Sequence, residues 1–243
     1  MSTKGEKKSV KALNAPKSVH IHRKESTWTV NTKAGAHKKE AAVSLGIALR
    51  NFTNLARDLK EAKTIMLNGD VKVNGRIRKD HRFGVGVFDI ISIERQKAFY
   101  RVLLDAKGRI ILKELKKDSN EKLSKVEKKQ VTSKGLQITT NDGLTIIGTK
   151  AKVGDTLKLK VPENTVEEVI PMEVGSNIYI TKGVHCSEYG KIAEVVSGTA
   201  KRKKLIKIDE EGKEYATTAK NVFVIGKGKI ALDELKWDLW MKY

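Results

Sequence analysis

Residues 58–78 read Asp-Leu-Lys-Glu-Ala-Lys-Thr-Ile-Met-Leu-Asn-Gly-Asp-Val-Lys-Val-Asn-Gly-Arg-Ile-Arg, and this stretch decides the fold of the first half of the chain. The pattern predicts a helix that begins after Asp58, whose carboxylate can accept from free backbone amides, with Glu61 completing a capping box. Asn68-Gly69 supplies a left-handed stop. The apolar stripe has helical spacing and consists of Leu59, Ala62, Ile65 and Met66.

A β-hairpin is predicted directly after this helix. Val71–Val73 and Arg76–Arg78 alternate on either side of the turn signal Asn74-Gly75. A further strand is predicted over Val87–Ile93, after the pair Gly84 and Gly86. The hairpin and this strand together indicate a small sheet.

Another helix is predicted before the capped one, between Ala41 and Ala56. Its apolar residues share one helical face, with Arg50 and Arg57 off that face. The stripe consists of Leu45, Leu49, Phe52 and Leu55. The unit is therefore two helices that lead into a small sheet.

The charge of the chain favours polyanionic partners. Its 243 residues include 49 Lys+Arg against 29 Asp+Glu, a formal net charge of +20. Residues 1–60 carry 13 basic and 4 acidic side chains, and residues 61–120 carry 14 and 8. This spread predicts a long contact path along a phosphate backbone, with a generic solubility charge as the alternative.

The rest of the composition points to small domains in a reducing compartment. Hydrophobic residues make up 39% and aromatic residues 5%, which favours thin cores and speaks against one large enzyme core. The single cysteine, Cys186, cannot form an internal disulfide. Apolar stretches are shorter than the roughly 18 residues of a membrane span, and no apolar signal segment follows the basic N-terminus. We expect a cytoplasmic protein without membrane association.

Residues 1–40 are predicted to form an extended basic arm. They contain few apolar residues and no sustained period, so phosphates have to neutralise them before they become ordered. Between the charges lie four rings that can stack on unpaired bases, namely His20, His22, Trp28 and His37. For Trp28, an anchor packed on the next domain is the alternative.

Residues 106–173 are predicted to be rich in β-structure. Leu136–Thr140 and Leu144–Ile147 alternate around the turn at Asn141-Asp142-Gly143. Thr156–Val161 is a further strand, which Pro162 ends. Lys116–Lys129 is a mixed-charge stretch of the kind found in solvated helices and linkers.

Two more strands are predicted beyond Pro171. Asn177–Gly183 and Gly190–Val196 are joined by a loop. Four charges follow at Lys201–Lys204, ahead of the alternating Leu205–Ile208.

These segments carry a family resemblance. The run Ala62–Gly75 resembles the S4-type RNA-binding fold, in which a basic helix and the following hairpin grip structured RNA. With its flanks it resembles the archaeal and eukaryotic small-subunit ribosomal protein family S4e. The flanks are Leu13–Pro16, Arg23-Lys24 and Gly35–His37 before the run, and Val85–Ile93 and Tyr100–Asp105 after it. The central stretch, with Val153–Leu157, resembles the central domain of that family, and the strands after Pro171 resemble a KOW motif.

Some positions depart from the family pattern. Val19 stands where the family tends to have tryptophan, and Ala34 and Ala36 stand where it tends to have proline. The loop Val184–Tyr189 lacks the usual basic, asparagine-containing sequence. Ala231–Tyr243 resembles nothing in the family and predicts a helix whose apolar stripe covers either its own domain or a neighbouring protein.

No residue set suggests catalysis, a metal or a cofactor. His185-Cys186 lacks the second half that a zinc site needs. Gly226–Lys229 lacks the spacing of a phosphate loop, and no nucleophile elbow or dinucleotide fingerprint is present. We therefore expect no enzyme activity, no cofactor, no bound metal and no small-molecule substrate.

These observations predict an α+β, multi-domain chain. The domains are a basic N-terminal arm at 1–40, a small S4-type α/β RNA-binding domain at 41–105, a β-rich central domain at 106–173, a KOW/SH3-like small β-barrel at 174–226 and a tail with a short C-terminal helix at 227–243. The resemblance implies a structural constituent of the small ribosomal subunit that holds its ribosomal RNA beside neighbouring ribosomal proteins and supports assembly and translation. The alternatives are an RNA-modifying enzyme with an S4-type capture domain and a transcription factor of the KOW type.

The candidate RNA-binding residues are chosen because they lie in the basic segments, and no other feature of the sequence selects individual side chains. They are Lys7, Lys8, Lys11, Lys17, His20, Arg23, Lys24, Lys38, Lys39, Arg50, Arg57, Lys60, Lys63, Arg76, Arg78, Lys79, Arg82, Lys182, Lys191, Lys201, Arg202, Lys203 and Lys204.

Overall fold

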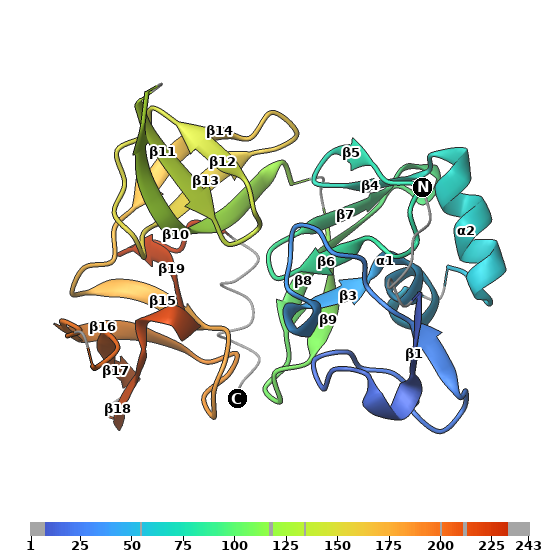
Figure 1. Ribbon diagram of the computed structural model, residues 1–243, viewed down its shortest axis with the longest axis horizontal. Helices are drawn as coiled ribbons and strands as arrows, with labels where there is room; N and C mark the ends of the chain where they lie inside the picture. The colour runs from blue at the N-terminus through green and yellow to red at the C-terminus, as the bar shows by residue number, and fades with distance from the viewer. Residues whose placement is uncertain are drawn as a thin grey trace. The chain divides into compact units, whose positions relative to one another are not determined.

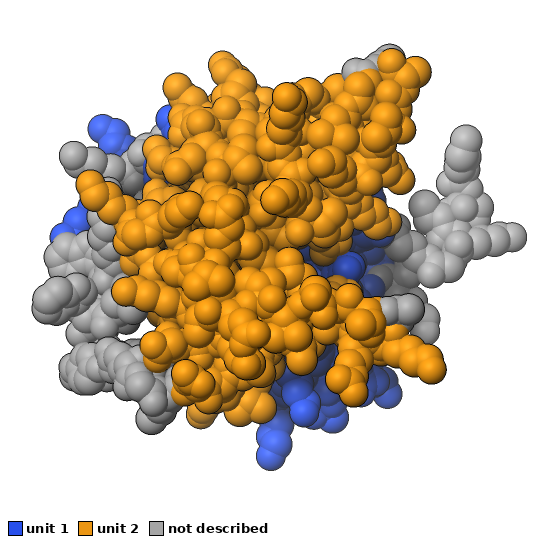
Figure 2. Space-filling view, turned by 90° about the vertical axis from the view of Figure 1, so that its left-hand side faces the viewer, with its two compact units in different colours: residues 1–103, 109–120 blue, residues 104–108, 121–243 orange. Residues whose placement is uncertain are grey.

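The structure is a computed structural model that describes residues 8–53, 55–116, 119–133, 135–199, 201–210 and 213–232. It is rich in β-strands and contains few helices (Figure 1). The chain divides into two compact units, with residues 1–103 and 109–120 in unit 1 and residues 104–108 and 121–243 in unit 2 (Figure 2). Across the described ranges, no helix is both long and apolar enough to span a bilayer.

The arm is folded rather than extended along its length. β1 (Ser9–Lys11) pairs antiparallel with β2 (Trp28–Val30), and a 3-10 turn at Ala12–Asn14 follows β1. The guanidinium of Arg23 donates to the carbonyls of Ala12, Ala15 and Pro16 at 2.8–3.1 Å. The predicted disorder was wrong here because a single side chain satisfies the carbonyls of the connecting loop, so order does not depend on a large apolar area.

The first predicted helix begins later than its pattern indicated. Ala42–Ser44 form β3, which pairs with β6 (Gly84–Gly86) and is fully buried, so the chain is extended there. The helical part consists of α1 (Leu45–Ile47) and a π-helical turn at Ala48–Phe52. A 3-10 turn at Lys39–Ala41 precedes β3.

The second helix, α2 (Leu59–Asn68), has the predicted ends, and Gly69 stops it with a φ of 89°. Its cap differs from the prediction. The Asp58 side chain makes no capping hydrogen bond, and the Glu61 carboxylate accepts from the backbone amide of Arg57 at 2.8 Å. The bond from the Glu61 side chain back to the backbone is therefore present, but to the amide one residue before Asp58. The bond from the Asp58 side chain forward to a helix amide is missing.

The main sheet of unit 1 has the strand order β5-β4-β7-β8-β9 (Figure 1). The predicted hairpin is confirmed as β4 and β5. The predicted strand over 87–93 begins only at Ile90, because Phe88 has a φ of 68° and the chain turns between β6 and β7. The bounds are β4 Val71–Val73, β5 Arg76–Ile77, β7 Ile90–Ile93, β8 Ala98–Leu104 and β9 Ile110–Leu115, with a 3-10 turn at Glu94–Gln96.

One sheet of unit 2 has the strand order β12-β11-β10-β13-β14. Its strands are β10 Glu121–Thr132, β11 Gly135–Thr140, β12 Thr145–Ile147, β13 Thr156–Lys160 and β14 Thr165–Ile170. A core of Val126, Ile138, Ala151, Leu157 and Leu159 lies against it. The predicted hairpin and the strand before Pro162 are confirmed.

The interpretation of Lys116–Lys129 as a solvated helix or linker was wrong. Most of it is the central strand β10, in which Lys122 and Lys125 are buried. The charge of Lys122 is met by Asp142, and Lys125 donates to distant backbone carbonyls. Lysines can thus be buried in this strand because their hydrogen-bond and ion-pair partners come from residues distant in sequence, although the sequence of the strand is polar.

The other sheet of unit 2 has the order β18-β17-β16-β15-β19. Its strands are β15 Ser176–Ile180, β16 Tyr189–Val196, β17 Leu205–Glu210, β18 Lys213–Thr218 and β19 Val222–Lys227, with a 3-10 turn at Ala219–Asn221. The predicted strand pair is confirmed as β15 and β16. The predicted C-terminal helix falls mainly on residues 233–243, which lie outside the described residues.

Candidate nucleic-acid interface

Most of the predicted basic residues of the arm lie on its surface. Those with exposed side chains are Lys8, Lys11, Lys17, His20, Lys24, Lys38 and Lys39. Arg23 is different, because its guanidinium is engaged by the carbonyls of the arm. Lys7 lies outside the described residues. The arm therefore presents lysines on a backbone that Arg23 keeps in shape.

The aromatic and histidine rings of the arm differ in exposure. Trp28 is 57% exposed, so it is not a buried anchor among the described residues. His20 and His22 are exposed neighbours whose ring centroids lie 6.4 Å apart. His37 was predicted to stack on bases, and this was wrong: its side chain is 5% exposed because it binds a buried carboxylate.

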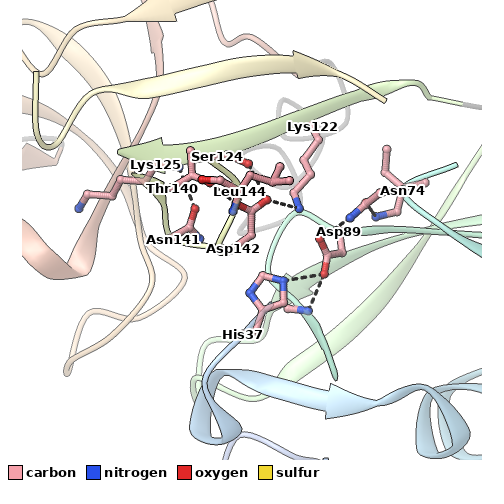
Figure 3. A network of polar contacts seen from close by, with 12 residues as sticks. His37, Asn74, Asp89, Lys122, Ser124, Lys125, Thr140, Asn141, Asp142 and Leu144 are labelled. Atoms are coloured by element: carbon pink, nitrogen blue, oxygen red, sulfur yellow. Dashed lines mark hydrogen bonds and ion pairs between the residues drawn. The ribbon is translucent and has the colours of Figure 1, made fainter. Parts of the chain in front are cut away.

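The buried carboxylate is Asp89, which joins the arm to the hairpin of unit 1 (Figure 3). Its Oδ2 accepts from His37 Nε2 at 2.7 Å and from the Gly86 amide at 2.9 Å. Its Oδ1 accepts from Asn74 Nδ2 at 2.8 Å, and Asn74 Oδ1 accepts from the Ile90 amide. This network was missed because its members are up to 52 residues apart, although Asn74 was recognised as a turn residue.

Around α2 and β5, the basic side chains are mostly exposed. Those on the surface are Arg57, Lys60, Lys63, Arg76 and Lys79. Burial, Lys63 and Arg82 lower the pKa of His81, while Asp80 raises it. The fold thus brings the helix residue Lys63 close to the loop after β5, although the two are well separated in sequence.

Three arginines of this region contact the protein itself. Arg82 is 7% exposed and donates from Nε to the carbonyl of Asn31 at 3.3 Å. Arg50 donates to the side chain of Asn51 at 2.8 Å. Arg78 lies over the ring of Phe83 at 4.4 Å from the centroid. The structure therefore places Arg82 inside unit 1, where it positions the arm, rather than on the predicted RNA-binding surface.

In unit 2, the predicted basic residues lie at the surface of the second sheet. Lys182 and Lys191 are exposed, and so is the run Lys201–Lys204. The backbones of Thr199 and Arg202 bond to each other in both directions, at 2.9 and 3.2 Å, so the run lies in the tight connection between β16 and β17. Four successive charges are thus held at one end of a hairpin.

The loop Val184–Tyr189 is organised by its own side chains. His185 Nδ1 lies 2.8 Å from a Glu188 carboxylate oxygen, and the imidazole stacks on Tyr215 with 4.0 Å between centroids. Cys186 is buried, which raises the pKa of its thiol. No three His, Cys, Asp or Glu side chains are close enough to hold a metal ion in the part of the chain that the structure describes.

The polar core of unit 2 surrounds Asp142 (Figure 3). Lys122 Nζ lies 2.7 Å from Asp142 Oδ2, which also accepts from the hydroxyl of Ser124 at 3.0 Å. Thr140 Oγ1 bonds to the other oxygen. Nearby, Lys125 donates to the carbonyls of Ala219 and Val222, at the 3-10 turn before β19. These contacts connect the two sheets of unit 2.

Sequence models of two families match the chain. The RS4NT (NUC023) domain matches residues 4–40, and the model described as ribosomal family S4e matches residues 96–166. A curated relative, the small ribosomal subunit protein eS4 of Methanosphaera stadtmanae, is 40% identical over 232 residues, which cover 94% of this chain and 96% of the relative. The protein of the same name from Archaeoglobus fulgidus is 36% identical over 89% of this chain and 92% of its own.

A solved structure is similar as well. The crystal structure of the 30S ribosomal protein S4e from Thermoplasma acidophilum aligns with a TM-score of 0.68 at 32% identity. The alignment covers 78% of this chain and 97% of that one.

Proposed function

Because this chain belongs to the ribosomal protein family S4e, we propose that it is a structural constituent of the small ribosomal subunit and holds ribosomal RNA there. The observation that carries this proposal is the 40% identity to a small-subunit protein over 94% of the chain. Family members bear the names of ribosomal proteins, so the chain is a structural protein and the RNA-modifying alternative has no support. Its expected location is the cytoplasmic ribosome, beside other ribosomal proteins.

The finer domain assignment is part of this proposal. We assign residues 1–40 to an RNA-binding arm and 41–105 to an S4-type domain, with support from the consecutive elements α2, β4 and β5. We assign 106–173 to a central domain, 174–226 to a KOW domain and 227–243 to a C-terminal tail. The paired strands β15 and β16 support the KOW assignment.

The mechanism of binding is electrostatic positioning on a folded RNA. Lysine and arginine side chains replace condensed counterions on the phosphate backbone. In the S4-type domain, exposed Arg57, Lys60, Lys63, Arg76 and Lys79 are available to an A-form groove. Recognition there depends on shape, phosphates and 2′-hydroxyl groups, because side chains cannot enter the deep, narrow major groove of A-form RNA to read its base edges.

A sucrose gradient tests the proposal. The tagged chain is expressed in its host, and lysates are sedimented at low and at high salt. We expect the chain to remain with small subunits and polysomes at both salt concentrations. A chain that stays at the top of the gradient at low salt would overturn the proposal.

A further inference from the structure

A recess opens in unit 1 between the arm and the loop that follows β5. Its volume is about 490 Å³, and its walls include Lys33, Gly35, Arg78, Lys79, Asp80 and Phe83. Ligand pockets in proteins commonly have volumes of about 300–1,000 Å³, so the space suits one nucleotide and exceeds the needs of a bare anion.

The walls of the recess are held in place by the protein. The Lys33 amide donates to the Arg82 carbonyl at 2.8 Å, which fixes the arm against the loop. Asp80 is already engaged, because its carboxylate lies 3.7 Å from Lys33 Nζ and accepts from the Arg82 amide at 2.9 Å. The acidic group in the wall is thus neutralised, and the recess keeps a basic character.

Arg78 is held in place by a ring contact, while the hydrogen-bonding capacity of its side chain is not used by the described residues. Its guanidinium carbon lies over the ring of Phe83, 4.4 Å from the centroid. Its Nε is buried, and its side chain has no hydrogen-bond acceptor and no carboxylate partner among the described residues. A guanidinium offers donors in a planar fork that fits phosphate, and its free face can stack on a base.

We propose that this recess binds one unpaired nucleotide of an RNA, with the phosphate on Arg78 and Lys79 and the base inside the recess. The inference rests on the proposed function, since it names the ligand class at one place of the RNA-binding surface. It makes the arm and the loop after β5 two walls of one subsite, so that neither alone would hold the nucleotide.

The test is filter binding of the full chain to small-subunit ribosomal RNA from its host over a range of salt concentrations. Arg78→Lys keeps the charge but loses the planar fork and the ring contact. We expect affinity to fall about tenfold with an unchanged salt slope, which is the range for loss of a stacking contact. Arg95→Lys, a matched control on the exposed 3-10 turn after β7 and outside the predicted RNA-binding residues, should stay within about twofold of wild type.

A second variant tests the space instead of the chemistry. A Cβ at Gly35 would meet no atom within 4 Å, so Gly35→Leu can begin its side chain there and adds bulk at the wall. We expect it to weaken binding as Arg78→Lys does, and hydrogen exchange of unit 1 should match wild type for both. Unchanged affinity in both variants, with wild type still bound, would overturn the subsite and leave the proposed function intact. Failure of wild type itself to bind the RNA would overturn both.

Discussion

Asp89 in unit 1 and Asp142 in unit 2 are both 2% exposed, yet they are held by different kinds of partner. Asp89 accepts hydrogen bonds from an imidazole, a side-chain amide and a backbone amide. Asp142 is paired with the ammonium of Lys122 and with two hydroxyl groups. The contacts of Asp89 given above thus come from an imidazole and two amides, whereas those of Asp142 include the ammonium of a lysine.

The difference follows from what each carboxylate connects. The partners of Asp89 come from the arm, from the β4–β5 turn and from β6, so the network fastens a basic arm to its domain. The partners of Asp142 come from β10 and the end of β11, within one sheet. The network of Asp89 uses no lysine of the arm among its contacts given above, and those lysines lie on the surface, whereas unit 2 buries Lys122 beside Asp142.

The largest expected effect comes from removing the charge of Asp142. Asp142→Ala removes the carboxylate that lies 2.7 Å from the buried ammonium of Lys122, and breaking a buried ion pair from one side costs about 3–5 kcal/mol. Native-state hydrogen exchange of β10 and β11 measures this as faster opening. The control is Lys227→Met, which breaks the exposed pair with Glu173 and should leave exchange nearly unchanged. If exchange in β10 and β11 is the same in both variants, the pair of Lys122 and Asp142 does not stabilise the core of unit 2.

In unit 1, the corresponding change is steric. A Cβ on Gly86 would lie 2.5 Å from ring atoms of His37, so Gly86→Ala displaces the imidazole from Asp89. We expect a loss of about 2–3 kcal/mol from overpacking and the lost hydrogen bond, read by hydrogen exchange in β6 and β7. Gly35→Ala is the control, because its Cβ meets nothing within 4 Å. Equal stability of the two variants would contradict a fixed His37.

A third prediction concerns the other buried lysine of unit 2. Burial lowers the pKa of Lys125 to about 8, with a raising effect of Glu127 and a lowering effect of Lys204. Between pH 8 and its ordinary pKa, the unfolded chain holds a proton that the native chain has released, so stability rises with pH. From pH 8 to pH 10 the gain is about 2 kcal/mol.

The measurement for this prediction is urea unfolding of wild type and Lys125→Met at several pH values. The difference between the two should change over pH 8–10 and be flat below about pH 7. A difference that is constant over the whole range would show that Lys125 keeps its proton.

The smallest expected effect is at the start of α2. There, as between Gly86 and Asp89, a backbone amide donates to a carboxylate, but the contact is exposed. Glu61 accepts from the Arg57 amide at the surface, so Glu61→Ala should cost about 0.5–1 kcal/mol. Asp58→Ala should cost less, since the Asp58 side chain makes no capping hydrogen bond. Urea unfolding of the two variants ranks them, and the reverse order would restore the capping role that the sequence indicated for Asp58.

The sequence predicted local structure well where turn residues determine it. Asn74-Gly75, Asn141–Gly143 and Gly69 mark turns or a helix stop that the structure contains. These signals act through positive φ angles, which few residue types adopt. The strand pairs and the helix end at these residues could therefore be predicted before any coordinates, whereas the α+β class was only partly right, because the structure is rich in strands and has few helices.

Features that depend on distant partners could not be predicted. Lys122 and Lys125 read as solvent-exposed because their acceptors lie elsewhere in the chain. His37 was assigned to RNA because Asp89 is 52 residues away. For the candidate site, the sequence identified the basic segments. It did not distinguish Arg23 and Arg82, which contact protein carbonyls, from Arg78, whose side chain meets no such carbonyl in the part of the chain that the structure describes.

The division of the chain into units has a consequence for its synthesis. Apart from the short segment 104–108, unit 1 consists of residues that precede every residue of unit 2. A ribosome that adds about 5–20 residues per second needs roughly 6–25 s for residues 121–243. During that interval the arm and its network around Asp89 can already form on the nascent chain. The basic half can thus reach RNA as a folded body while the second half is still being translated.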